Sequence, residues 1–438
     1  MNNNNAQILL DKINSNNITI GVLGLGYVGL PLAVTFAKKQ VKVLGFEKSI
    51  SKASSVNKGI NYIADVKDEE LRHVTQETKM LSATADFSRI SEVDAVIICV
   101  PTPLDRFKKP DMNYIASACE DIASYMKSGT FISLESTTYP TTTEEFMLPV
   151  LQSKGLVLNS DFWLCFSPER VDPGNVIYKT ANTPKVVGAL GDDAKEIALA
   201  LYGLAIETLY TVSSPRVAEM VKILENTYRL INISLINEIA LLAGKMGIDI
   251  WEVIEAAKTK PYGFQAFYPG PGIGGHCIPL DPFYLEYIAK QYNFDLTMIN
   301  TAGRIDTIMP HRMVVMISST LNKQKKPING SKILFLGVAY KPNISDERES
   351  PALRIMDEVS HKGGQVSYHD PYIDHVITHE GREFDSVSLT EDVLQEADLV
   401  VFTTNHASLD TGWIVKHAPL VVDLRNAVQD AHPHVYKL

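Results

Sequence analysis

The sequence predicts an α/β fold: two Rossmann-like parallel-sheet domains joined by a long central helix. Three observations predict it. Strand-like runs alternate with helical segments over roughly residues 1–210, an apolar helical stripe starts near residue 214, and a second α/β pattern follows a polar segment at 323–331. We therefore expect domains at 1–212, 213–322 and 323–438.

The first domain is predicted from short apolar runs that are typical of buried parallel strands. A helix from Leu30 to about Lys39 separates the first two runs, as a doubly wound sheet requires. The strand-like runs are 18–24, 41–46, 95–100, 130–135 and 162–166.

A long helix is predicted to begin at Ser214-Pro215, because serine is a good N-cap and proline suits the first helical position. It should end before Gly247. An ordinary core helix and a helix that packs against a second subunit both explain its apolar stripe. The stripe comprises Val217, Val221, Leu224, Tyr228, Ile231, Leu235, Ile239 and Leu242.

The last domain is predicted to be a second Rossmann-like sheet without a glycine fingerprint. Its expected strands are 332–337, 365–368, 399–403 and 420–424, with a helix starting at Ser350-Pro351. Two α/β domains joined by a helix would leave a cleft, which is a usual place for a substrate.

The overall composition argues against several kinds of partner. The 438 residues carry a net charge of −10, which disfavours non-specific binding to nucleic acid or anionic membranes. No apolar run approaches the roughly 20 residues that span a bilayer, and residues 1–5 lack the features of a signal peptide. We expect a cytoplasmic protein that binds neither nucleic acid nor membrane.

A glycine fingerprint follows the first strand and opens the first helix. Gly24 permits a tight turn, Gly26 lets the backbone approach a pyrophosphate, and Gly29 allows close packing of helix and sheet. Glu47 stands 18 positions later, where it would bind ribose hydroxyls and repel a 2′-phosphate. This pattern predicts NAD rather than NADP, although the neighbouring Lys48 weakens the preference slightly. A purely structural glycine turn is the alternative.

Cys277 lies in a run of glycines and prolines that would present its thiol on an exposed loop. A presented thiol beside a nicotinamide site suggests oxidation through a covalent sulfur intermediate. Cys99, Cys119 and Cys165 have apolar neighbours and are expected in the core. Cysteine and histidine spacings predict no metal site, and no Cys–His dyad is expected with His276.

Other polar residues have both a chemical and an ordinary explanation. Lys222 and Asn226 share one face of the long helix, where an oxyanion site and a solvated surface are both possible. Glu169 and Thr137 follow strands, but a loop salt bridge and a helix cap explain them equally well. Three basic residues of the last domain could hold phosphates or be surface charges: Lys341, Arg348 and Arg425.

In this order the motifs resemble those of the UDP-sugar 6-dehydrogenase family over nearly the whole chain. They are 24–29, Cys99-Val100-Pro101-Thr102-Pro103, Glu135-Ser136-Thr137-Thr138-Tyr139-Pro140, Ser167-Pro168-Glu169-Arg170, Lys222 with Asn226, Gly274-Gly275-His276-Cys277, Tyr340-Lys341, Asp346-Glu347-Arg348-Glu349-Ser350 and 421–426. The resemblance implies a four-electron oxidation at C6 of a UDP-sugar, in which Cys277 carries a thiohemiacetal and then a thioester.

The resemblance also implies roles for individual residues. The expected catalytic residues are Cys277, Lys222, Asn226, Asp281, Glu169 and Thr137. The expected NAD contacts are Gly24, Gly26, Tyr27, Val28, Gly29, Glu47, Pro101, Thr102, Thr137 and Arg348. The expected substrate contacts are Glu169, Arg170, Lys222, Asn226, Phe267, Tyr268, Gly274, Lys341 and Arg425, the last of which the partner subunit of a homodimer or higher oligomer can supply.

Two departures from the family pattern narrow the substrate. Leu280 stands where UDP-glucose enzymes carry lysine, and Pro173, beside Asp172, stands where they carry a second glutamate. Both favour a UDP-N-acetylhexosamine: UDP-N-acetylglucosamine first, with UDP-N-acetylmannosamine and UDP-N-acetylgalactosamine as alternatives. The product would serve surface polysaccharides such as capsule or O-antigen. A two-electron dehydrogenase and a silent sugar-nucleotide sensor are the competing functions.

Overall fold

A computed structural model describes residues 4–63, 66–105, 109–172, 174–175, 177–275 and 277–438. It divides into two compact units, residues 1–225 with 283–294 and residues 226–282 with 295–438. The helices α8 (Pro215–Met246) and α10 (Asp281–Ala289) each contribute residues to both units. The predicted boundaries at residues 212 and 322 stay predictions, because the contacts divide the chain within these two helices.

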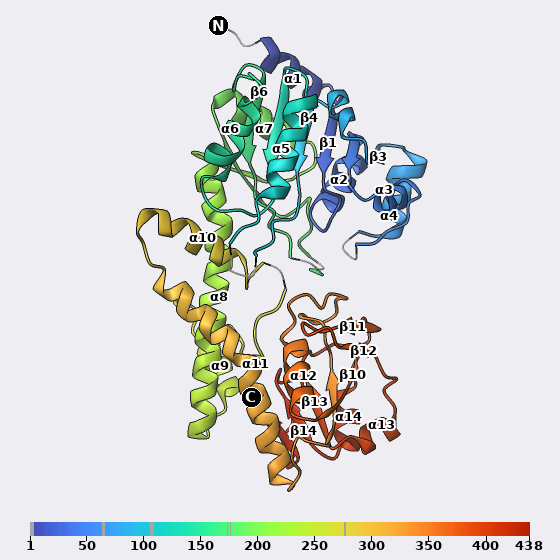
Figure 1. The fold of residues 1–438 in the computed structure, drawn as a ribbon, viewed down its shortest axis with the longest axis vertical. Coiled ribbons are helices and arrows are strands. Elements are labelled where there is room, and N and C mark those ends of the chain that lie inside the picture. The colour runs from blue at the N-terminus through green and yellow to red at the C-terminus, as the bar shows by residue number, and fades with distance from the viewer. Residues whose placement is uncertain (1–3, 64–65, 106–108, 173, 176, 276) are drawn as a thin grey trace. The chain divides into compact units, whose positions relative to one another are not determined.

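The first unit is built on an eight-stranded sheet of order β3-β2-β1-β4-β5-β6-β7-β8 (Figure 1). All neighbouring strands are parallel except β6 and β7. The strands are β1 (Thr19–Leu23), β2 (Lys42–Phe46), β3 (Leu81–Thr84), β4 (Ala95–Ile98), β5 (Thr130–Leu134), β6 (Phe162–Phe166), β7 (Lys185–Ala189) and β8 (Leu209–Val212). The five predicted strands are confirmed, whereas β3, β7 and β8 were not predicted.

Helices cover both faces of this sheet, which explains why the central strands β4, β5 and β6 are buried at every position. One core lies under α1 (Asn4–Asn14), α2 (Gly29–Lys38) and α7 (Asp192–Gly203), with α3 (Ile50–Asn57) and α4 (Asp68–Arg72) near its edge. The other lies under α5 (Asn113–Tyr125) and α6 (Leu148–Gln152). Cys99, Cys119 and Cys165 are buried, as predicted. Short helical turns lie at His73–Glu77, Phe87–Glu92, Thr142–Met147 and Lys290–Tyr292.

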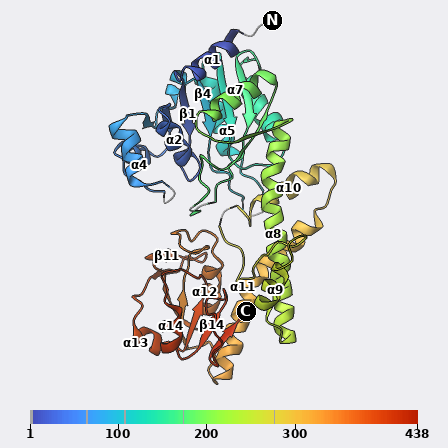
Figure 2. The ribbon, with the colours of Figure 1, turned by 180° about the vertical axis from the view of Figure 1, so that it is seen from behind.

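The second unit contains a five-stranded parallel sheet of order β10-β9-β13-β14-β15. Figure 2 shows the ribbon of this unit from behind. Its strands are β9 (Lys332–Leu336), β10 (Gln365–His369), β13 (Leu399–Phe402), β14 (Val421–Asp423) and β15 (Val435–Lys437), and a hairpin joins β11 (His375–Ile377) and β12 (Glu383–Asp385). After β9, the chain places β10 on one side of β9 and β13 on the other, so the strand order reverses at β9. Such a switch point is where open α/β sheets bind ligands.

Helices again cover both faces of this smaller sheet. The long α11 (Thr297–Lys323) and α12 (Pro351–His361) cover one face, and α13 (Glu391–Glu396) and α14 (Thr411–His417) cover the other. The helix α9 (Ile250–Lys258) packs on α8 in a separate small core. The polar segment predicted at 323–331 lies between the end of α11 and the start of β9. The predicted first strand of the last sheet is therefore confirmed.

The long predicted helix is confirmed as α8, with 32 residues. Ser214 Oγ lies 3.5 Å from the backbone nitrogen of Val217 at its start. Most of the predicted apolar stripe does not face the core: Leu224 is 63% exposed and Leu242 is 57% exposed. Val217, Tyr228, Leu235 and Ile239 are exposed as well. Val221 differs from them, because it is partly buried against the core of the first sheet. The six exposed residues are therefore a surface feature rather than core packing.

Candidate active site

The glycine loop between β1 and α2 has the backbone that its sequence predicts. Gly24 has φ +90°, and an added Cβ would come within 2.6 Å of the Cys99 carbonyl oxygen. A Cβ at Gly29 would come within 1.9 Å of the Gly24 oxygen, so no side chain fits there. Nothing lies within 4 Å of the corresponding position at Gly26. The loop is therefore closed against the sheet at two glycines and open at the third, which fits a dinucleotide pyrophosphate.

Glu47 follows β2 and lies beside this loop, as predicted. Its carboxylate accepts hydrogen bonds from the backbone nitrogens of Leu25 (3.3 Å) and Ser49 (3.0 Å), which fix it at the end of the strand. The Lys48 ammonium instead donates to Ser117 Oγ at 2.8 Å. Because this hydrogen bond directs the Lys48 ammonium toward Ser117, the neighbouring lysine no longer argues against NAD at this site.

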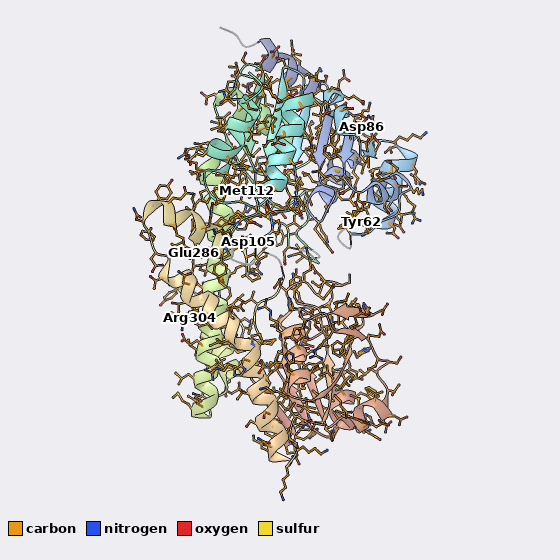
Figure 3. The ribbon with its side chains drawn as sticks, in the orientation of Figure 1. Tyr62, Asp86, Asp105, Met112, Glu286 and Arg304 are labelled. Carbon is orange, nitrogen blue, oxygen red and sulfur yellow. The ribbon has the colours of Figure 1, made fainter. Side chains whose placement is uncertain are left out.

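Tyr62, labelled in Figure 3, is a second neighbour of the glycine loop, and no sequence pattern indicated it. Its hydroxyl donates to the carbonyl oxygen of Leu25 at 2.8 Å. Burial and, secondly, the charge of Glu47 raise the pKa of Tyr62 to about 12. The hydroxyl therefore stays protonated and keeps its donor role across the physiological pH range.

Further predicted residues follow three adjacent parallel strands of the same sheet. Pro101 and Thr102 follow β4, Thr137 follows β5, and Glu169 follows β6, so all lie at one edge. Ser136 Oγ donates to the Val100 oxygen at 2.8 Å and ties two of these loops together. The carboxyl edge of a doubly wound sheet is the expected position for a cofactor and substrate.

Lys222 on α8 meets the Glu169 loop within the first unit. Its ammonium donates to the main-chain oxygen of Glu169 at 2.7 Å. The Glu169 carboxylate accepts from the backbone nitrogens of Arg170 (2.8 Å) and Val171 (2.7 Å). Arg170 forms an ion pair of 2.6 Å with Glu225, also on α8. The structure thus brings Glu169, Arg170 and Lys222 together, and Glu225 is a partner that sequence reasoning missed.

A buried glutamate one turn before Lys222 holds the threonine-rich loop. The Glu219 carboxylate accepts from the backbone nitrogens of Thr141 (2.6 Å) and Thr143 (2.9 Å) and from Thr143 Oγ1 (2.6 Å). Burial raises the pKa of Glu219 to about 7, against the opposing effect of these hydrogen bonds. The threonine-rich loop at 141–143 is therefore fixed on α8 by a residue that the sequence analysis did not single out.

In the second unit, Asn226 and Asp281 form a buried pair. The Asn226 amide nitrogen donates to the Asp281 carboxylate at 2.5 Å. The backbone nitrogen of Asp281 donates in turn to the carbonyl oxygen of Cys277 at 2.8 Å. This chain of contacts joins three predicted catalytic residues at the start of α10.

The loop before Cys277 is held by contacts along its length. The Gly270 nitrogen donates to Asn237 Oδ1 at 2.9 Å, and the Ile273 nitrogen donates to Asp306 Oδ1 at 2.7 Å. The Gly275 nitrogen donates to the Arg348 oxygen at 2.9 Å. Cys277 itself is exposed, as predicted. His276 and Pro173, on which two of the sequence arguments rest, lie outside the described residues.

The basic residues of the last sheet have different surroundings. Arg348 donates to the Asp346 carboxylate at 2.9 and 2.7 Å, while Lys341 lies partly buried in the loop after β9. Arg425 donates to the Thr403 oxygen at 3.1 Å and lies against Gly270. Burial lowers the pKa of Arg425 to about 10, which still leaves its guanidinium charged at neutral pH.

Phe267 and Tyr268 are engaged in packing contacts. The Phe267 ring meets Tyr228 edge to face at 5.7 Å, and the Tyr268 ring stacks on Trp251 at 6.2 Å. The Tyr268 hydroxyl donates to Glu255 at 2.7 Å. Among the described residues, neither side chain has a hydrogen bond or ring contact to the Cys277 loop, so their substrate role stays a prediction.

The described part of the chain contains neither a metal-binding cluster nor a helix that could span a membrane. No three histidine, cysteine, aspartate or glutamate side chains converge there as a metal site would require. No described helix has both the length and the apolar content needed to cross a membrane.

A doubly wound sheet with an open glycine loop and a carboxylate after β2 defines an NAD-dependent oxidoreductase. Models of three domains match the chain: an NAD binding domain over residues 18–206, a central domain over 216–307 and a UDP binding domain over 334–430. The chain belongs to the UDP-glucose/GDP-mannose dehydrogenase family.

Individual relatives cover nearly the whole chain. A UDP-N-acetyl-D-glucosamine 6-dehydrogenase of Pseudomonas aeruginosa is 35% identical over 359 residues, covering 82% of this chain and 83% of that protein. A UDP-N-acetyl-D-mannosamine dehydrogenase of Pyrococcus horikoshii is 33% identical over 418 residues, covering 94% and 96%. A solved UDP-D-ManNAc dehydrogenase structure from Pyrococcus horikoshii matches with a TM-score of 0.87 and 32% identity, covering 96% and 98%.

Proposed function

We propose that this enzyme oxidises UDP-N-acetylglucosamine at C6 to UDP-N-acetylglucosaminuronate. The observation that carries the proposal is the exposed Cys277 on a loop tied to the buried Asn226–Asp281 pair. A thiol in this position can hold the C6 carbon through two oxidations, which a simple alcohol dehydrogenase does not need.

The proposed reaction balances as follows. The C6 alcohol loses a hydride and a proton to give an aldehyde, and the Cys277 thiolate adds to form a thiohemiacetal. Loss of a second hydride gives a thioester, which water hydrolyses to the carboxylate and the free thiol. NAD, when bound, accepts one hydride at each oxidation. One alcohol, one water and two NAD⁺ become one carboxylate, two NADH and three protons.

The remaining site residues are assigned the roles that the family resemblance implies. Lys222 is a cation that can stabilise the oxyanions of the thiohemiacetal and of the hydrolytic intermediate, aided by the Asn226 amide. Asp281 and Thr137 position or activate water, and Glu169 moves the proton in hydrolysis. The contact of Lys222 with the Glu169 main chain in the first unit and that of Asn226 with Asp281 in the second support these roles.

The remaining substrate and cofactor contacts are proposed from the same resemblance. Lys341 and Arg425 carry positive charge suited to a nucleotide diphosphate, with Arg170, Phe267, Tyr268 and Gly274 beside the sugar. NAD is proposed to contact Gly24, Gly26, Tyr27, Val28, Gly29, Glu47, Pro101, Thr102, Thr137 and Arg348. Reduced cysteines and this chemistry suit the cytoplasm, and the uronate product would supply a surface polysaccharide such as capsule or O-antigen.

The stoichiometry of NADH release tests the reaction. We expect two NADH and an acid product per UDP-N-acetylglucosamine, and Cys277→Ser should block net acid formation. One NADH with a stable aldehyde or ketone would instead show a two-electron enzyme. Tight UDP-sugar binding without turnover in excess NAD would show a sensor.

The configuration of the sugar is tested in the same assay. Relatives that act on N-acetylglucosamine and on N-acetylmannosamine are similarly distant from this chain. Initial rates with the UDP derivatives of N-acetylglucosamine, N-acetylmannosamine, N-acetylgalactosamine and glucose should rank N-acetylglucosamine first. A higher kcat/KM for any of the other three would replace it as the substrate.

We also propose a homodimer or higher oligomer in which α8 packs against a second copy. The exposed residues of its stripe recur at steps of three, four and seven, so they line one side of the helix. A second copy of the same helix would cover this side with a matching apolar surface.

A further inference from the structure

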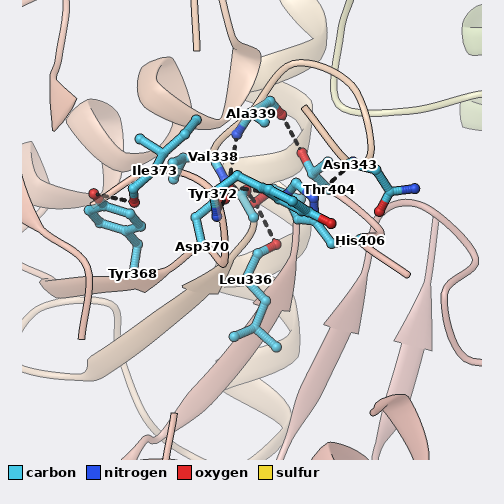
Figure 4. A network of polar contacts seen from close by, with 12 residues as sticks. Leu336, Val338, Ala339, Asn343, Tyr368, Asp370, Tyr372, Ile373, Thr404 and His406 are labelled. Atoms are coloured by element: carbon cyan, nitrogen blue, oxygen red, sulfur yellow. Dashed lines mark hydrogen bonds and ion pairs between the residues drawn. The ribbon is translucent and has the colours of Figure 1, made fainter. Parts of the chain in front are cut away.

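A buried pair of ionisable side chains lies in the second unit, and the sequence analysis singled out neither residue. Asp370 follows β10 and is 2% exposed, and His406 lies beyond β13 and is 0% exposed. His406 Nε2 and Asp370 Oδ2 are 3.1 Å apart (Figure 4). These strands lie on either side of β9, so the pair spans the switch point of the sheet.

Asp370 holds the start of the loop that follows β9. Its Oδ2 accepts from the backbone nitrogens of Val338 (2.7 Å) and Ala339 (3.1 Å), and its Oδ1 accepts from the nitrogen of Tyr372 (2.9 Å). Burial alone would raise the pKa of Asp370, but these bonds and the contact with His406 hold that pKa below its ordinary value. The carboxylate is therefore a permanently charged acceptor at neutral pH.

His406 holds the end of the same loop. The backbone nitrogen of Asn343 donates to His406 Nδ1 at 3.0 Å, so Nδ1 is the unprotonated ring nitrogen. The proton then resides on Nε2, which donates it to Asp370. The Tyr372 ring contacts the imidazole in a tilted arrangement, with centroids 5.1 Å apart and planes at 43°, and restricts the orientation of the imidazole.

Two further contacts complete the anchoring of the segment 338–343. Thr404 Oγ1 donates to the Ala339 oxygen at 2.5 Å, and the Ala407 nitrogen donates to Asn343 Oδ1 at 2.8 Å. Gly337, directly before the segment, has φ +83° and lies against Thr404. Both ends of the segment are thus fixed to residues beyond β10 and β13.

This segment carries two residues next to the proposed chemistry. Tyr340 packs on the loop before Cys277: a Cβ added at Gly274 or Gly275 would come within 2.6 or 2.8 Å of the Tyr340 side chain. Lys341 is the adjacent residue and the proposed sugar-nucleotide contact. All these residues belong to the second unit.

We propose that Asp370 and His406 are positioning residues for the UDP-sugar, because they fix the segment 338–343 and with it Lys341. The proposal rests on the proposed function, since it assigns Lys341 to the sugar nucleotide. Pre-ordering a binding segment lowers the conformational entropy lost on binding, so release of the anchor weakens affinity without removing a ligand contact.

UDP binding to the full-length protein tests this proposal by calorimetry, with NAD as the control ligand. His406→Leu should weaken UDP binding roughly tenfold or more, because two anchoring hydrogen bonds are lost. His406→Gln should restore most of the affinity, since its amide oxygen and nitrogen can accept from Asn343 and donate to Asp370. Affinity for NAD should stay within about twofold in both variants.

Thr404→Val keeps the protein testable if His406→Leu does not fold. It preserves the shape of the side chain, removes the bond to Ala339 and should weaken UDP binding in the same selective way. In turnover, the variants should raise the KM for the UDP-sugar more than they lower kcat. Equal UDP affinity in folded His406→Leu or Thr404→Val, or an equal loss of NAD affinity, would overturn the proposal.

The two proposals fail in distinguishable ways. A wild-type protein that binds UDP but does not oxidise the UDP-sugar, with weaker UDP binding in His406→Leu, would refute the proposed function and support the anchor. Normal four-electron turnover with unchanged UDP affinity and KM in His406→Leu would support the function and refute the anchor.

Discussion

The Asn226 amide donates a 2.5 Å hydrogen bond to the Asp281 carboxylate, and both side chains are buried. A buried carboxylate held by a neutral donor keeps a defined orientation, because its oxygen cannot turn away without losing this bond. The backbone nitrogen of the same aspartate bonds to the Cys277 carbonyl. The thiol loop and the buried pair are thus one local structure.

Asp281→Asn tests the charge of this pair at nearly constant shape. We expect kcat to fall about 100-fold or more, with a small change in the KM for the UDP-sugar, because a general base loses its proton affinity. Steady-state NADH formation measures both constants. Asp410→Asn is the matched control: Asp410 caps α14 and asparagine caps equally well, so activity should not change. Equal activity of Asp281→Asn and the control would refute the role of Asp281.

Glu219 predicts a pH dependence of stability. The folded pKa is raised from 4.5 to about 7, so the folded state binds the proton more tightly than the unfolded state. The tighter proton binding therefore adds to the free energy of unfolding. This added stability is complete below pH 4.5, is lost as the pH rises to about 7, and amounts to about 3 kcal/mol at most. Urea unfolding of wild type and Glu219→Gln at several pH values measures it.

The difference between these two unfolding free energies should vary with pH only across that window. Glu219→Gln should be less stable at low pH, because its amide nitrogen would face the Thr141 backbone nitrogen. Its disadvantage should shrink toward neutral pH, where the wild-type carboxylate carries a buried charge. A difference that is constant from pH 4.5 to 7 would contradict the raised pKa.

Thr141 combines backbone strain with a buried hydroxyl. Its φ is +89°, which a β-branched residue rarely adopts, and its Oγ1 has no hydrogen-bond partner among the described residues. Thr141→Gly should raise the unfolding free energy by about 1 kcal/mol. Thr141→Ala removes the hydroxyl but keeps most of the strain, so it should gain less. Thermal unfolding compares the three proteins, and a lower Tm for the glycine variant would contradict the strain.

Lys185 forms a buried ion pair with Glu135, with Nζ and Oε2 2.9 Å apart. The Tyr202 hydroxyl also donates to Glu135, at 2.7 Å. Lys185→Met should destabilise the protein by roughly 3–5 kcal/mol, because Glu135 would keep a buried charge without its cation. Adding Glu135→Gln should recover part of this loss. Chemical denaturation measures both variants, and a double variant less stable than the single would contradict the charge argument.

The exposed stripe of α8 predicts the assembly state. Wild type should be a dimer or larger in light scattering, and Leu235→Glu with Leu242→Glu should dissociate it at micromolar concentration, because the interface would bury two charges. Lys245→Glu, at an exposed polar position of the same helix, should leave the assembly intact. A monomeric wild type would exclude α8 as a self-association surface.

Features coded by nearby residues were predicted well. The glycine loop, Glu47 and the start of α8 each depend on local backbone preferences and short spacings, so the sequence alone indicated them. The exposed Cys277 belongs with these, because a run of glycines and prolines excludes regular structure locally.

Pairings across long sequence separations were not predicted. Glu219 meets Thr141 across 78 residues, and Asp370 meets His406 across 36. No periodicity links such residues, since tertiary packing alone decides which loop ends meet. The antiparallel β6–β7 pair escaped prediction for the same reason. The direction of the α8 stripe did too, because a helical period does not say what covers it.

The arrangement of the thiols has a practical consequence. All four cysteines are described, three are buried, and Cys277 alone is exposed. A maleimide dye should therefore attach at one position without any cysteine being removed first. The natural protein thus carries its own attachment point for a fluorophore, and substrate protection of that reaction would follow ligand occupancy without a turnover assay.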